Sequence, residues 1–172
     1  MLFRSVSQSR YGCVYDEEGG AVEVHRAKID AVKELLESGE RLITAYNYNH
    51  TREALFDALS SYRIDDLKRT GVDKAWNAGE LDAVISHPRS VGHGLNVQDG
   101  GTGVCWFGNN YSLDLFKQLN ARLHRQGRTR PVTVFQIVAK GTIDEEILKS
   151  LDKKDNLQNI LINLLSKNLT NV

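Results

Sequence analysis

The segment from Gln118 to Arg128 carries the side chains whose type and spacing are best suited to chemistry. In a helix, with about 100° per residue, Gln118, Arg122 and Arg125 fall on one narrow stripe. Gly127 is expected to end this helix. A second, apolar stripe lies about a third of a turn away and consists of Phe116, Leu119 and Leu123. Paired guanidinium groups on a helix can neutralise charge on a transferring phosphoryl group. The alternative interpretation is that these basic side chains are simply solvated at the end of the helix, where the helix dipole favours positive charge.

A glycine-containing loop precedes this helix in the sequence and follows an apolar, strand-like run. Within it, Gly92 and Gly94 permit tight turns and close approach of a ligand to the backbone. Ser90 and Asn96 can donate hydrogen bonds to phosphate or ribose oxygens. A glycine pair alone is typical of an ordinary structural loop. Ahead of a Gln/Arg/Arg helix, it indicates a site for a phosphorylated ligand.

Composition describes a globular chain with one local concentration of positive charge. The 172 residues carry a formal net charge of zero, with 41% hydrophobic and 26% charged residues, which argues against a general polyanion-coating protein. Yet no Asp or Glu occurs from Leu115 to Ile143, a stretch with six basic residues. Such a surface on a neutral protein predicts a specific anionic partner.

Cysteine and histidine usage predicts a cytoplasmic protein without a metal site. The two cysteines, Cys13 and Cys105, do not suggest a disulfide framework, and the five histidines form no HxxxH or HExxH pair. We expect no metal ligands, no membrane span, and a location in the cytoplasm.

Helical and strand-like periods alternate along the chain, which predicts an α/β fold with a parallel sheet. We expect Trp76 to be buried as an anchor of the core. The segment 62–67 is too short for its pattern to indicate either a helix or a strand. The expected helices cover 25–37, 52–59, 72–77 and 112–125, and the expected strands cover 41–46, 81–86, 103–107 and 132–138. In such sheets ligands gather at the carboxyl ends of the strands.

The C-terminal region is expected to contain two helices. Thr142 and Glu145 fit a capping box that starts a helix running to about Leu151. A final helix follows, and we expect its apolar face to dock on the domain, because an exposed stripe would promote association. That face consists of Leu157, Ile160, Leu161, Leu164 and Leu165.

Four of these segments resemble motifs of superfamily-two helicases, especially the Swi/Snf-type branch and its phage relatives. The stretch 89–97 (RSVGHGLNV) resembles motif V, and 118–127 (QLNARLHRQG) resembles motif VI. The stretch 42–48 resembles motif IV, and 141–145 resembles the family's ending after the last core strand. The likeness runs from about Tyr11 to Leu151, with the motifs in the family's order.

This resemblance implies the second RecA-like domain of an ATP-driven DNA helicase or translocase. The expected fold is an α/β, RecA-like three-layer sandwich: a mostly parallel sheet with helices on both faces, plus a C-terminal helix. Residues 1–20 would be an arm or linker from a missing first motor domain, and residues 21–152 would be the RecA-like helicase C-terminal domain. Residues 153–172 would form a helical appendage.

The family pattern also implies roles for particular residues. Arg122 and Arg125 would act as arginine fingers toward the γ-phosphate of ATP, with Gln118 beside them. The residues implied near the nucleotide are Gly92, Gly94 and Asn96, and those implied at the DNA backbone are Asn47, His87, Arg89, Ser90 and His93. The chain departs from the pattern at Pro88, where a threonine is usual, at Val91, where a glycine is usual, and at Arg128, where a glutamine often closes motif VI.

The chain contains no G-x-x-x-x-G-K-[ST] sequence, the motif that cradles the β- and γ-phosphates of a nucleotide. We therefore expect ATP and Mg²⁺ to bind only together with the first, P-loop domain, in the same parent chain or in a separate subunit. DNA is the other expected partner. The alternatives are a non-catalytic DNA-binding or interaction module on the same fold and, less favoured, an unrelated doubly wound nucleotide-binding enzyme.

Overall fold

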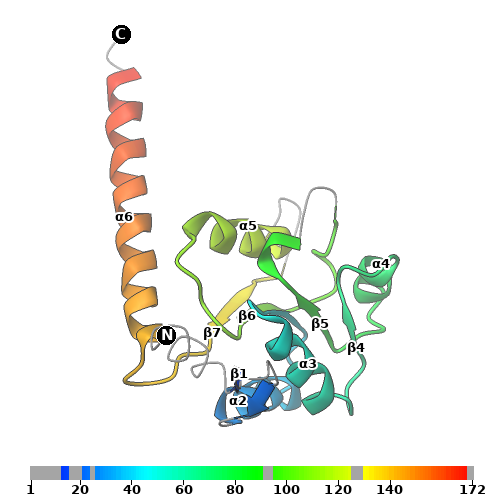
Figure 1. Ribbon diagram of the computed structural model, residues 1–172. Helices are drawn as coiled ribbons and strands as arrows, with labels where there is room; N and C mark the ends of the chain where they lie inside the picture. Colours follow the sequence, from blue (N-terminus) through cyan, green and yellow to red (C-terminus); the bar gives the residue numbers. More distant parts are fainter. Residues whose placement is uncertain (1–12, 16–20, 24–25, 91–94, 125–129, 170–172) are drawn as a thin grey trace.

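The structure is a computed structural model that describes residues 13–15, 21–23, 26–90, 95–124 and 130–169. Its centre is a five-stranded parallel sheet in the order β4-β5-β3-β6-β7 (Figure 1). The strands are β3 (Leu42–Ala45), β4 (Ile64–Asp66), β5 (Ala83–Ser86), β6 (Gly103–Trp106) and β7 (Thr133–Gln136). Two short antiparallel strands, β1 (Cys13–Tyr15) and β2 (Ala21–Glu23), form a separate ribbon.

The central strand β3 fixes the register of the sheet. Leu42 lies opposite Ala83 of β5 on one side and Gly103 of β6 on the other. Every residue of β3, β5 and β6 is buried, as expected for parallel strands covered on both faces. Because β3 and β6 are neighbours while β4 and β5 intervene in sequence, the strand order reverses between them.

Helices cover both faces of the sheet, so the expected three-layer α/β sandwich is confirmed. α2 (Ala27–Glu37) and α3 (Asn49–Ala58) pack on one face, and α4 (Val72–Asn77) and α5 (Leu113–Leu123) pack on the other. Figure 1 shows α2 and α5 on opposite sides of the strands. The first face buries Ile29, Val32 and Leu55, among others.

Trp76 is the expected anchor of the second face. Its side chain is fully buried, and its indole N–H donates to the Val97 carbonyl oxygen at 3.0 Å. Gly100 and Gly101 pass so close to the ring that a Cβ on either would lie 2.3 Å from an indole carbon. Only glycine therefore permits this loop to close over the tryptophan.

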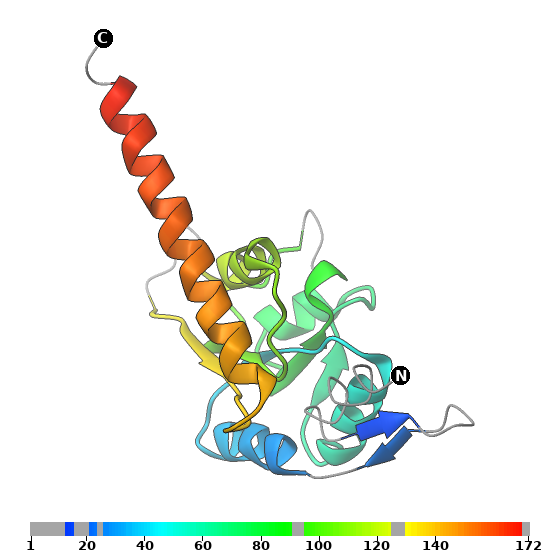
Figure 2. The same ribbon diagram turned by 60° about the vertical axis from the view of Figure 1, so that its left-hand side comes forward.

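The C-terminal region differs from the expectation of two helices. A single helix, α6 (Ile143–Leu169), runs through the predicted break near Leu151, because no glycine or proline interrupts it. Ile147 and Leu151 are buried against the domain, whereas the next apolar positions are exposed. Leu157, Ile160 and Leu161 are 59%, 55% and 52% exposed, so the prediction that this face docks is wrong for these three residues. The side chains of Leu164 and Leu165 lie outside the described residues. Figure 2 shows the distal half of α6 projecting beyond the sheet.

Candidate functional site

The carboxyl edge of the sheet gathers Asn47 and His87, which the sequence singled out, together with residues that it did not. Asn47 follows β3, and His87 follows β5. The loop Gly108–Asn110 follows β6, and Gln136 ends β7. All five strands are parallel, so these positions share one edge, where α/β sheets bind their ligands.

His87 lies two residues before the segment that resembles motif V, and its imidazole contacts two neighbouring residues. Its Nδ1 accepts a hydrogen bond from the Arg89 backbone N–H at 3.2 Å, and its ring meets Tyr46 edge-to-face at 5.8 Å. Burial lowers the pKa of His87 below its ordinary value, and the nearby charges of Lys68 and Arg89 lower it further. The ring is therefore neutral at pH 7, and it is suited to donate a hydrogen bond rather than to supply a positive charge.

The next three residues, Pro88–Ser90, form a short 3-10 turn. Pro88 is buried, Ser90 is half-buried and its N–H donates to the His87 carbonyl oxygen at 2.8 Å, while Arg89 is exposed. The turn thus presents one guanidinium at the sheet edge. The expected contacts at Gly92, His93 and Gly94 lie outside the described residues.

Asn96 lies where the loop returns toward the core. Its backbone carbonyl accepts from the Asn77 side chain at 2.7 Å, and its Oδ1 accepts from the Gln98 N–H at 3.4 Å. The residue is exposed. Its backbone is therefore fixed to the end of α4, while its side chain lies at the surface.

α5 carries the segment that resembles motif VI and presents distinct faces. Leu119 and Leu123 are fully buried in the core, whereas Gln118 is exposed and Arg122 is half-exposed one turn further along. The separation into an apolar and a Gln/Arg stripe follows the helical spacing seen in the sequence. The helix ends at Leu123, two residues earlier than expected, and Arg125 lies outside the described residues.

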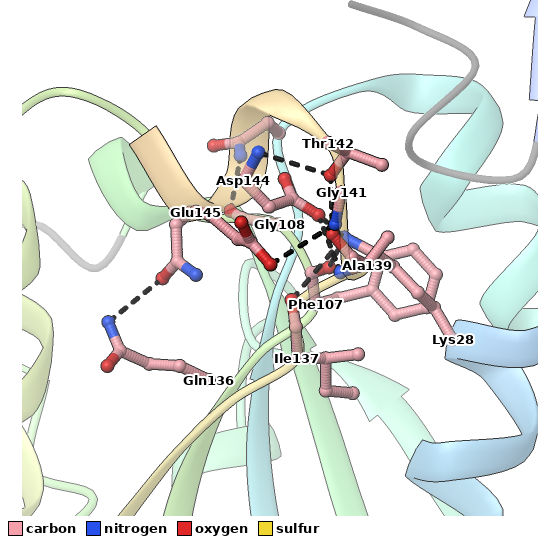
Figure 3. A network of polar contacts seen from close by, with 12 residues as sticks. Lys28, Phe107, Gly108, Gln136, Ile137, Ala139, Gly141, Thr142, Asp144 and Glu145 are labelled. Atoms are coloured by element: carbon pink, nitrogen blue, oxygen red, sulfur yellow. Dashed lines mark hydrogen bonds and ion pairs between the residues drawn. The ribbon is translucent and has the colours of Figure 1, made fainter. Parts of the chain in front are cut away.

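A buried network below the site was not foreseen from the sequence. Lys28 Nζ lies 2.5 Å from Asp144 Oδ2, with 4% and 0% of the two side chains exposed. The same ammonium group donates to the carbonyl oxygens of Phe107 and Ile137, each at 3.4 Å, at the carboxyl ends of β6 and β7 (Figure 3). The sequence did contain a sign that Lys28 is buried. It lies four residues before Val32, on the stripe of α2 that faces the core.

A second unforeseen cluster lies at the end of β4. The Arg52 Nε donates to Asp66 Oδ2 at 2.6 Å, and the Asp66 carboxylate is almost completely buried. Burial raises the pKa of Tyr46 beside this pair, and the negative charge of Asp66 raises it further. This cluster joins α3 to the strand ends and supports the position of His87 through Tyr46.

The donor set of the described residues suits part of a nucleotide site. Amide and guanidinium groups on α5 match phosphate oxygens. Among those residues, however, no group of three or more His, Cys, Asp or Glu side chains is placed to hold a metal ion. No helix in the described ranges is long and apolar enough to cross a membrane.

Comparison with solved structures shows that a chain of a known ATPase shares this fold. A chain described as the C-terminal part of the Fun30 ATPase domain shares the fold, with a TM-score of 0.64 and 20% identity over 81% of this chain and 54% of that chain. The fold and the resemblance of its segments define a helicase C-terminal domain. No protein-family model matches the chain.

The sequence comparisons make the assignment more specific. The chain is 26% identical to the chromatin-remodeling ATPase INO80 of Neurospora crassa over 148 residues, and 29% identical to that of Aspergillus oryzae over 123 residues. These matches cover 79% and 72% of the chain. It is also 32% identical to the putative protein p41 of Acyrthosiphon pisum secondary endosymbiont phage 1, in an alignment of 171 positions that covers 94% of this chain. The chain is thus a helicase C-terminal domain related to the Snf2-family ATPases, and it has a phage relative.

The chain spans only part of each relative. It covers 37% of the phage protein, 7% of the Neurospora ATPase and 8% of the Aspergillus ATPase. The relatives are therefore larger proteins in which this domain is one part.

Proposed function

We propose that this chain is the second motor domain of an ATP-dependent DNA helicase or translocase. Arg122 and Arg125 supply positive charge to the γ-phosphate of an ATP held by a separate P-loop domain, and Gln118 assists beside them. The observation that carries this proposal is the Gln/Arg stripe of α5, where Gln118 and Arg122 lie outside the core on a helix that resembles motif VI.

The nucleotide is bound mainly by the P-loop domain, together with Mg²⁺, and supplies the energy of hydrolysis. On the present chain, the loop containing Gly92, Gly94 and Asn96 approaches the nucleotide and links it to the DNA-contacting turn. The guanidinium groups of Arg122 and Arg125 act when the two domains close, since their role is to balance charge that develops on the phosphoryl group. The relatives' identity as ATPases supports this role.

The DNA backbone binds along the carboxyl edge of the sheet. Arg89 contributes a charged contact, and His87, Ser90 and His93 contribute hydrogen bonds without sequence preference. The exposure of Arg89 and the neutral state of His87 support this division. We place the protein in the cytoplasm of a bacterial or phage-infected cell, on the basis of the phage relative.

The ATPase test uses the chain together with a P-loop domain. Arg125→Ala and Arg122→Ala are expected to lower DNA-stimulated kcat by about 10³-fold or more, as for arginine fingers in other phosphoryl-transfer systems. Lys149→Ala, an exposed cation on α6, is the matched control and should keep wild-type turnover. The chain alone should show no ATPase activity. Wild-type turnover in Arg125→Ala would refute the finger role.

DNA binding by the chain distinguishes the two kinds of contact. Arg89→Ala should lower the slope of log K against log salt by about 0.9, because one phosphate charge is no longer neutralised. His87→Ala should weaken binding without changing that slope. DNA binding with no stimulation of any P-loop partner would favour the alternative, a non-catalytic DNA-binding module.

A further inference from the structure

The connection between β6 and α5, residues 107–112, is held by side chains from three surrounding elements. Lys28 of α2 donates to its first carbonyl, that of Phe107. Asn47, which follows β3, donates from Nδ2 to the Gly108 carbonyl oxygen at 2.5 Å. Gln136, at the end of β7, donates from Nε2 to Asn109 Oδ1 at 3.2 Å. A loop at an open sheet edge is therefore fixed almost residue by residue.

Asn47 uses both ends of its amide in this arrangement. While Nδ2 binds the Gly108 carbonyl, Oδ1 accepts a hydrogen bond from Asn110 Nδ2 at 3.4 Å. The contact bridges β3 and β6, the two neighbouring strands between which the strand order reverses. These amides therefore lie where the strand order reverses, the part of such sheets that often binds ligands.

The contacts continue without interruption into α5. Asn110 Oδ1 accepts from the Ser112 N–H at 2.9 Å. Ser112 is the N-cap of α5, and its Oγ accepts from the Leu115 N–H at 3.3 Å. An N-cap fixes where a helix starts and the angle at which the chain enters it. Asn47 is thereby linked to the first turn of the helix that carries Gln118 and Arg122.

We propose that Asn47 is a positioning residue that fixes the start of α5, and with it the Gln118/Arg122 stripe, rather than a contact to the DNA backbone. The inference rests on the proposed function for the significance of that stripe. A rotation at the N-cap would displace residues two and three turns along the helix, so loss of Asn47 changes how the guanidinium groups meet a phosphate without removing them.

The first experiment uses the chain alone and does not depend on ATPase activity. In Asn47→Ala, amide hydrogen exchange within Phe116–Leu123 should rise at least tenfold relative to exchange in α2. Asn49→Ala, an exposed asparagine two residues away, is the matched control and should leave that ratio unchanged. Asn110→Asp keeps the acceptor for Ser112 but removes the donor to Asn47, and it should reproduce the effect. Unchanged α5 exchange in Asn47→Ala would overturn the proposal.

The second experiment separates positioning from DNA contact. Asn47→Ala should retain the wild-type DNA affinity and salt slope, whereas Arg89→Ala should lower both. With a P-loop domain present, Asn47→Ala should lower kcat about tenfold or more at an unchanged KM for ATP. A reduced DNA affinity with wild-type kcat would make Asn47 a DNA contact and overturn the proposal. Wild-type turnover in Arg125→Ala would instead overturn the finger role, so the two failures are distinguishable.

Discussion

Removing one member of the buried Lys28–Asp144 ion pair should be among the most destabilising single changes in the domain. Lys28→Met keeps the length and most of the packing of the side chain but leaves the Asp144 carboxylate, which is 0% exposed, without its countercharge. Breaking a buried pair in this way costs about 3–5 kcal/mol. With a urea m-value of about 2 kcal/mol/M, the unfolding midpoint should fall by about 1.5–2.5 M.

The assay is urea unfolding followed by far-UV circular dichroism. Lys33→Met, on the same helix and only half-buried, is the matched control and should change stability by less than about 0.5 kcal/mol. The double variant Lys28→Met/Asp144→Asn removes both charges and keeps an acceptor for the Ala139 N–H, which donates to Asp144 at 3.1 Å. It should be more stable than Lys28→Met alone. A midpoint shift below about 0.5 M for Lys28→Met, or a double variant no better than the single one, would refute the reasoning.

Three further predictions follow from burial. Burial raises the pKa of the Cys105 thiol to about 12. In a Cys13→Ser background at pH 8, the native protein should therefore react with an aromatic disulfide reagent far more slowly than the urea-unfolded chain. Equal rates would contradict this prediction. Burial lowers the pKa of His50 below 6.5, so the unfolded state binds more protons and the free energy of unfolding should fall as pH drops from about 7 to 5. His50→Gln should flatten this pH dependence in urea titrations. An unchanged slope in the variant would show that His50 is not its source. Leu151→Ala should cost about 2–4 kcal/mol, whereas Leu161→Ala should cost less than about 0.5 kcal/mol, and similar losses would mean that the distal part of α6 is docked.

Apart from β1, β2 and β4, the order and type of the elements could be predicted, because the longer strands are continuous apolar runs and the helices carry clear apolar stripes. The ambiguous segment 62–67 contains β4, a three-residue edge strand whose apolar pattern is too short to separate from a helix. The sequence analysis expected a break near Leu151, but the spacing of apolar residues alone does not show where a helix ends. Glycine or proline would have marked a real break, and neither occurs there, so α6 continues as one helix.

The candidate site could be predicted only where its residues are close in sequence. Gln118 and Arg122 lie one turn apart, so helical spacing placed them together. Asn47 and Gly108 are 61 residues apart, and their contact requires knowing that β3 and β6 are neighbours. The Lys28–Asp144 pair spans 116 residues, so local sequence shows each residue in its helix but not the partner.

α6 is fastened to the domain at its base and again further along its length. Beyond the Asp144 contact, Lys117 of α5 pairs with Asp155 at 2.5 Å, and Lys154 donates to the Tyr111 carbonyl oxygen at 2.6 Å. These contacts connect the middle of α6 to α5 and to the loop before it. At 1.5 Å per residue, a 10° tilt about Asp144 would carry Leu169 through about 7 Å. Small adjustments of the Gln/Arg helix would thus be magnified at the far tip of α6 (Figure 2).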